Sequence, residues 1–121
     1  MNDDRAQPYT DTELRRLRAL ALVVRDFREL SPAFPSSYML AFLAVAMRPG
    51  GGSTDYMQTL ETAQPVASRI LIALGPKGRS SEGFGLVDTF IDTIDMRRKH
   101  TYLTDKGKTL VARILTHMER L

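Results

Sequence analysis

Two short runs of β-forming residues, set in a chain whose other segments have helical patterns, restrict the fold more than any other feature. The first run is Leu86 to Ile91 and the second is Lys99 to Leu103. The seven residues between them, 92–98, are mostly polar or charged. This arrangement predicts one β-hairpin over 86–103 with a long charged tip.

The first strong helical pattern covers residues 11–30. Thr10 or Asp11 can cap its start, and Ser31-Pro32 marks its end. Apolar residues recur at helical spacing and widen into more than one stripe, so we expect burial on several sides. A partner subunit could cover the second apolar side of this helix. Residues 1–10 are expected to form a flexible tail.

Three further helices are expected before the hairpin and one after it. They cover Tyr38 to Met47, Asp55 to Glu61 with Ser53 or Thr54 as its cap, Gln64 to Leu74, and 105–121 with Thr104 or Asp105 as its cap. The predicted fold class is therefore mainly α with a small β-hairpin, in one domain over 11–121. No internal repeat is present.

Composition excludes several classes of protein. The chain has no cysteine and only two histidines, so disulfide scaffolds and thiolate zinc sites are excluded. Asp88, Asp92 and Asp95 lack partners that would complete a metal site, and no catalytic constellation stands out. We expect no enzyme, cofactor, metal or membrane span, and a cytoplasmic location. His100 is expected to line a strand or meet a phosphate, and His117 to lie at the surface or in an interface.

The two helical segments within 54–74 predict a helix-turn-helix, in which the second helix enters the DNA major groove. Exposed polar residues near the start of each helix are the candidate DNA contacts: Thr54, Gln64, Ser68 and Arg69. Gln can pair with adenine and Arg with guanine or a phosphate. The alternative is an ordinary two-helix corner with solvated polar residues.

The hairpin tip carries Arg97, Arg98 and Lys99. Guanidinium groups on a protruding ribbon can enter a minor groove or contact phosphates. Asp92 and Asp95 are placed to hold one arginine. Residues 69–113 contain nine Lys or Arg and five acids, whereas 1–30 are balanced. The alternative interpretation is a solvated charged turn.

A glycine-rich loop at 75–85 carries Lys77 and Arg79. These two residues are candidates for an additional phosphate contact. The loop lacks the Gly-Lys-Ser/Thr step of a nucleotide-binding P-loop. The alternative is a mobile surface loop.

The second half of the chain resembles the MarR family of winged-helix regulators. The resemblance rests on Gly85-Leu86-Val87, then Asp92, then Asp95 to Lys99, and then the step Leu103-Thr104-Asp105-Lys106-Gly107. It implies that 86–103 is the wing, that Arg97 or Arg98 is the wing arginine, and that Ser68 and Arg69 lie in the recognition helix. The loop 75–85 and the glycine-rich link 49–52 depart from the family pattern.

The resemblance also implies a homodimer, built from the first and last helices, that represses transcription on double-stranded DNA. Candidate interface residues are Leu14, Leu17, Val24, Ile114 and Met118. Whether a small-molecule effector binds the protein stays open. Two other functions also stay open, namely a winged-helix module for protein interaction and a nonspecific architectural or replication-associated DNA binder.

Overall fold

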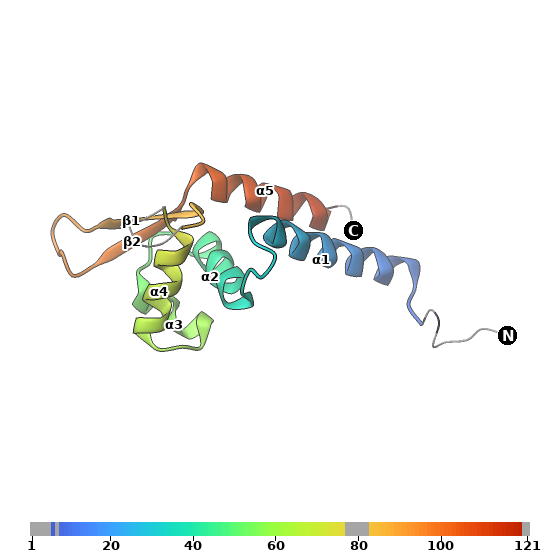
Figure 1. Cartoon of the computed structure of the whole chain (residues 1–121), viewed down its shortest axis with the longest axis horizontal. Coiled ribbons are helices and arrows are strands. Elements are labelled where there is room, and N and C mark those ends of the chain that lie inside the picture. Colours follow the sequence, from blue (N-terminus) through green and yellow to red (C-terminus); the bar gives the residue numbers. More distant parts are fainter. Residues whose placement is uncertain (1–5, 7, 77–82, 120–121) are drawn as a thin grey trace.

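The computed structural model describes residue 6 and the ranges 8–76 and 83–119. These residues form helices and one hairpin in the order expected (Figure 1). The elements are α1 (Asp11–Leu30), α2 (Ser36–Met47), α3 (Ser53–Leu60), α4 (Gln64–Leu74), β1 (Val87–Ile91), β2 (Lys99–Leu103) and α5 (Asp105–Glu119). Within the described ranges, no helix combines the length and apolar character that crossing a membrane needs.

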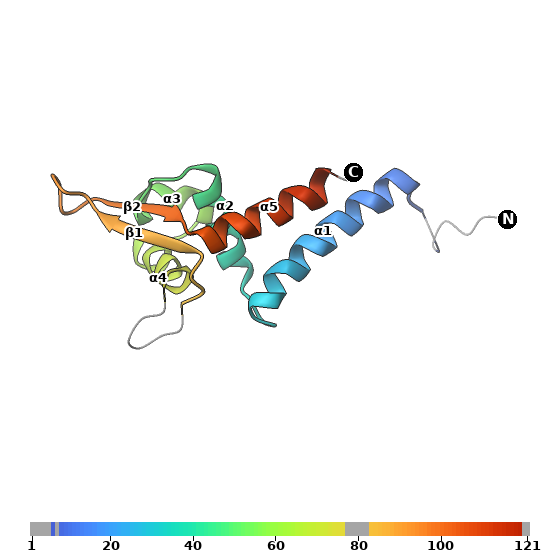
Figure 2. The same cartoon turned by 90° about the horizontal axis from the view of Figure 1, so that it is seen from above.

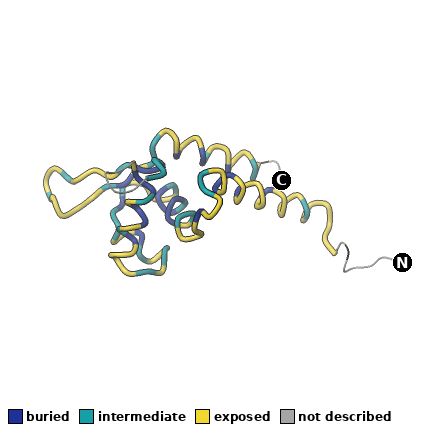
Figure 3. Tube along the Cα trace, in the orientation of Figure 1, coloured by how far each residue is buried: buried dark blue, intermediate teal, exposed yellow. Residues whose placement is uncertain are grey.

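The molecule is elongated, with the hairpin at one end and two long helices at the other. Helices α1 and α5 pack on each other, while α2, α3 and α4 lie together beneath the hairpin (Figures 1 and 2). Part of α1 is buried against the body of the protein, whereas much of its remaining surface is exposed (Figure 3). The hairpin end and the paired-helix end therefore offer separate surfaces.

The helix starts explain why these segments form where they do. Thr10 Oγ1 accepts from Glu13 N–H at 3.1 Å, and Glu13 accepts from Thr10 N–H at 2.8 Å, which completes a capping box for α1. These bonds lower the pKa of Glu13. At α5, Thr104 Oγ1 accepts from Gly107 N–H at 3.1 Å. Thr10 and Thr104 thus cap α1 and α5.

The predicted cap of α3 is wrong. Helix α3 begins at Ser53, so Ser53 and Thr54 lie inside it and Gly52 precedes it. The Asp55 carboxylate accepts from Gly52 N–H at 2.7 Å, which satisfies an unpaired amide at the helix start. An acidic side chain in the first turn therefore replaces the expected hydroxyl cap. Helix α2 likewise begins at Ser36, two residues earlier than expected, directly after Pro35.

The core is formed by side chains from each of the helices α1 to α5 together with the base of the hairpin. Its fully buried large side chains are Phe27, Phe42, Val45, Tyr56, Leu74, Leu86 and Val87. Tyr56 also has a polar role, because its hydroxyl donates to the Arg48 carbonyl at 2.7 Å and accepts from Gly51 N–H at 3.1 Å. Burial raises the pKa of Tyr56. Tyr56 thereby ties α3 to the link that precedes it.

The glycine-rich link 49–52 runs beside β2. Strands β1 and β2 pair antiparallel with Thr89 opposite Thr101. Thr101 in turn exchanges backbone hydrogen bonds with the link, donating to Gly51 and accepting from Gly50, both at 2.8 Å. Gly50 has φ +93°, a conformation that residues with a Cβ rarely adopt. The link therefore fixes the hairpin relative to α2 and α3.

The ends of the loop 75–85 are joined by backbone hydrogen bonds. Gly85 N–H donates to Gly75 and Leu86 N–H donates to Leu74, each at 2.8 Å. Phe84 packs against Phe34, with ring centroids 4.9 Å apart. Lys77 and Arg79 lie outside the described residues. The two ends of the loop are thus held together on the body of the protein.

Candidate nucleic-acid interface

Helices α3 and α4 form the expected helix-turn-helix. The turn between them is tight because Glu61 adopts the left-handed conformation, with φ 51°. Helix α4 buries Ala67, Ile70, Leu71 and Leu74 on one side. Its other side carries three polar residues. Gln64 and Arg69 are exposed, and Ser68 is half-buried. The polar edge of α4 is therefore directed away from the core.

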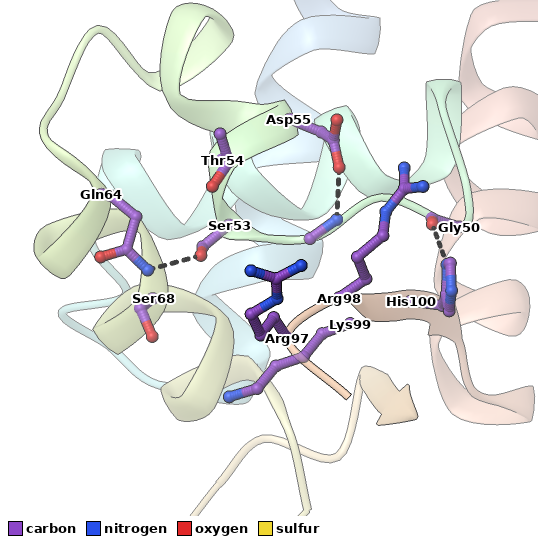
Figure 4. A pocket seen from close by; sticks show the side chains of 11 residues that line it. Gly50, Ser53, Thr54, Asp55, Gln64, Ser68, Arg97, Arg98, Lys99 and His100 are labelled. Atoms are coloured by element: carbon purple, nitrogen blue, oxygen red, sulfur yellow. Dashed lines mark hydrogen bonds between the residues drawn. The ribbon is translucent and has the colours of Figure 1, made fainter. Parts of the chain in front are cut away.

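A cleft of about 420 Å³ separates this helix pair from the wing (Figure 4). Most residues along the cleft are polar or charged. It is lined by Gly50, Gly52, Ser53, Thr54, Asp55, Gln64, Ser68, Arg97, Arg98, Lys99 and His100. Six of the nine candidate DNA contacts thus meet around one cleft, although they come from three separate elements.

Hydrogen bonds position several cleft residues. Gln64 Nε2 donates to Ser53 Oγ at 2.9 Å, which joins the start of α4 to the start of α3 (Figure 4). Arg69 is exposed on α4 but does not line the cleft. The helix-turn-helix therefore presents Thr54, Gln64 and Ser68 toward the wing.

The wing arginines, Arg97 and Arg98, come directly after residues 94–96 of the tip in the sequence. Arg97 Nε donates to Asp95 Oδ1 at 3.2 Å while its side chain stays 92% exposed. This contact confirms the expectation that an aspartate of the tip holds an arginine. Ile94 and Met96, beside these charges, are also strongly exposed. The outer tip is therefore charged, as expected, and it also exposes the apolar side chains of Ile94 and Met96.

Asp92 holds a histidine instead of an arginine. Its Oδ1 accepts from the amides of Ile94 and Asp95 at 2.8 and 3.0 Å, and its Oδ2 lies 2.8 Å from His100 Nε2. The Asp95 amide, the His100 ring and the Ile94 amide hold the pKa of Asp92 well below its usual range.

The other ring nitrogen of His100, Nδ1, lies 2.9 Å from the Gly50 carbonyl oxygen. The hydrogen bond to Asp92, and then that to Gly50, raise the pKa of His100. His100 lies in strand β2, which is the first of the two places expected for it, and both of its ring nitrogens are bonded within the chain. Sequence alone could not pair His100 with Gly50, fifty positions away.

His117, expected at the surface or in an interface, is half-buried where α5 packs on α1. Its Nε2 lies 2.8 Å from Oδ2 of the buried Asp26 on α1. This second histidine therefore belongs to the packing of α1 on α5. Across the described part of the chain, no group of three His, Cys, Asp or Glu is arranged to hold a metal ion.

The candidate interface residues divide into two groups. Leu17 and Val24 are exposed on α1, and Leu14 is partly exposed. Ile114 is buried in the core of the single chain, and Met118 packs partly against that core. The exposed apolar surface among these candidates therefore lies on α1 and not on α5.

The sequence matches no protein-family model and no curated protein. Solved structures are similar over most of the chain. A mutant of S. aureus MepR bound to an oligodeoxyribonucleotide has a TM-score of 0.62 at 20% identity, covering 93% of this chain and 78% of that one. A MarR-like transcriptional regulator from Thermotoga maritima has a TM-score of 0.60 at 23% identity, with coverages of 92% and 77%.

A third similar structure is the transcriptional repressor CouR bound to a 23-mer DNA duplex. Its TM-score is 0.55 at 24% identity, and the match covers 98% of this chain and 79% of that one. Because each of the three matches covers most of this chain, the similarity is to the whole arrangement of helices and wing. The protein therefore has the winged-helix fold of the MarR-family regulators.

Proposed function

We propose that this protein is a dimeric transcription regulator of the repressor type that binds double-stranded DNA. Helix α4 would read a major groove, and the wing would lie in the flanking minor groove. The observation that carries this proposal is the shared cleft, where Gln64 and Ser68 of α4 face Arg97 and Arg98 of the wing.

The proposed roles follow from the chemistry of each side chain. An α-helix fits the major groove, and residues near its exposed start reach base edges. Gln64 would exchange its hydrogen bond with Ser53 for one to a base. Arg69, on the same helix, would contact guanine or a phosphate. Thr54, at the start of α3, would contact the backbone.

Arg97, Arg98 and Lys99 would supply positive charge to the minor groove and its phosphates. Negative potential is concentrated in a narrow minor groove, which favours inserted arginines. Asp95 would limit the motion of Arg97 and so reduce the entropy lost on binding. Two of the similar structures are complexes with DNA, which supports DNA as the partner of this fold here.

Selection of genomic fragments by the purified protein tests the proposal. We expect enrichment of one inverted repeat, with half-site centres about one helical turn apart. Arg97→Ala with Arg98→Ala should weaken binding to that duplex by about tenfold or more and flatten its salt dependence. The matched control is Arg18→Ala with Arg25→Ala, which removes the same charge from exposed positions on α1.

The other outcomes separate the competing functions. Equal affinity for unrelated duplexes, with a steep salt dependence, would indicate an architectural DNA binder. Absence of DNA binding at low salt would contradict the proposal and favour a protein-interaction module. Equal losses in the wing and control variants would contradict the role given to the wing.

A further inference from the structure

His100 connects three separate segments at the rim of the cleft. It belongs to β2, its Nε2 bonds to Asp92 at the base of the wing tip, and its Nδ1 bonds to the Gly50 carbonyl of the link 49–52. Asp92 also organises the tip turn through the amides of Ile94 and Asp95. One imidazole ring therefore couples the tip turn to the segment that leads into α3, and Figure 4 shows its bond to Gly50.

The partners of His100 determine its protonation state. A carbonyl oxygen only accepts hydrogen bonds, and an ionised carboxylate also only accepts. Asp92 is kept ionised because three donors bond to it. Both ring nitrogens must then carry a proton, so the arrangement requires the imidazolium form. A neutral ring can donate only one of these bonds.

Losing one bond would loosen the wing. Among the described residues, the hairpin bonds to the link through the Thr101 backbone and through His100. Thr101 lies deeper in the sheet, and His100 is one residue nearer the tip. The His100 bonds are therefore the outer attachment of the wing, close in the chain to Arg97 and Arg98.

We propose that His100, as imidazolium, is a positioning residue that holds the wing against the link 49–52 and makes DNA affinity depend on pH. It would set where Arg97 and Arg98 lie relative to α4. This inference rests on the proposed DNA binding. It adds a residue that determines DNA affinity without contacting a base, because His100 would fix the distance between α4 and the wing.

The charges around His100 determine the direction of the effect. Asp92 favours the imidazolium, and Arg98 on the wing opposes it. On the link side, Arg48 is itself partnered with Asp55 at 3.8 Å. The raised pKa of His100 means that the attachment is complete at lower pH and is lost as pH rises through that pKa. DNA phosphates near the cleft would favour the imidazolium further.

The test measures duplex affinity between about pH 5.5 and about pH 8.5 at constant ionic strength. The probe is the fluorescein-labelled duplex recovered by the genomic selection. For the unmodified protein we expect affinity to fall about fivefold or more as pH rises. His100→Gln should bind with nearly constant, weak affinity across the range, and Asp92→Asn should shift the midpoint to lower pH.

The matched control is His117→Gln, which alters the only other histidine and should keep the pH dependence. In the DNA-free protein, nuclear magnetic resonance of the ring nitrogens should report a pKa of His100 above that of an ordinary histidine, with both nitrogens protonated below that pKa. An ordinary or lowered pKa there, or the same pH dependence in His100→Gln, would overturn the inference. DNA binding that is absent at every pH would instead contradict the proposed function, while the resonance measurement would still test the His100 state.

Discussion

Asp26 and His117 form a polar contact inside the apolar interface between α1 and α5. Asp26 is 8% exposed, and its carboxylate oxygens lie 2.8 Å from His117 Nε2 and 4.0 Å from Arg113 Nη1. Arg113 also reaches Glu29 at 3.4 Å. A buried carboxylate needs such partners, since leaving it unpaired costs far more than a paired contact gains. This contact therefore fixes how the two helices align.

Replacement of His117 by Leu should lower the free energy of unfolding by about 1–3 kcal/mol, because Asp26 then stays buried without its closest partner. Changing both residues to Leu should recover much of this loss, since no buried charge is left unpaired. Urea denaturation followed by circular dichroism measures both variants. A double variant less stable than His117→Leu alone would show that the pair stabilises the fold by itself.

Residues in such contacts could not be identified from the sequence. Asp26 and His117 are 91 positions apart, and each has the local pattern of a solvated helix residue. Their pairing depends on the angle at which α1 and α5 cross. Arg97 and Asp95 are only two positions apart, so their contact could be anticipated from spacing. Contacts set by local geometry can thus be predicted from the sequence, whereas contacts set by tertiary packing cannot.

At the scale of elements, local signals were sufficient for most of the fold. The β-forming runs predicted the hairpin, and Thr10 and Thr104 predicted two helix starts. The glycine-rich link 49–52 carries no local signal for its place beside β2, because its backbone bonds to Thr101 set that place. Six residues that line the cleft could be predicted from the sequence as DNA contacts, although the sequence did not show that they surround one cleft.

The loop between α4 and β1 gives a prediction at this scale. Its ends are held together by the Gly85–Gly75 and Leu86–Leu74 backbone bonds, and Phe84 is anchored by Phe34. Replacing 77–82 with two glycines should therefore leave the thermal midpoint nearly unchanged in a calorimetric scan. A shorter closed loop changes the closure entropy by only about 0.6 kcal/mol per halving of length.

The same variant tests whether Lys77 and Arg79 bind phosphates. If they do, DNA affinity falls and the salt slope becomes shallower by about one unit for each phosphate that is no longer neutralised. The control restores Lys77 and Arg79 within an otherwise glycine-serine loop of the original length. Unchanged affinity and slope in the shortened variant would remove both residues from the proposed interface.

At the scale of the whole molecule, α1 has two apolar faces. Ala19, Val23 and Phe27 are buried against the chain's own core, while Leu17, Leu20 and Val24 are 49%, 54% and 38% exposed. Helical spacing places the second group on a separate face beside the first. A contiguous exposed apolar stripe of this kind is typical of an interface. A second copy of the chain is the partner that the proposed inverted-repeat site requires.

Leu17→Glu should therefore convert the proposed dimer into a folded monomer, because a carboxylate on this stripe would be buried against the partner without a counter-charge. Sedimentation equilibrium measures the mass, and circular dichroism checks that the helices remain. Met47→Glu, at an exposed position on α2, is the matched control and should stay dimeric. A monomeric protein binds one half-site at a time, so duplex affinity should also fall in Leu17→Glu, while a single half-site should bind the variant and the unmodified protein equally well. A dimer that survives Leu17→Glu would place the interface elsewhere on the molecule.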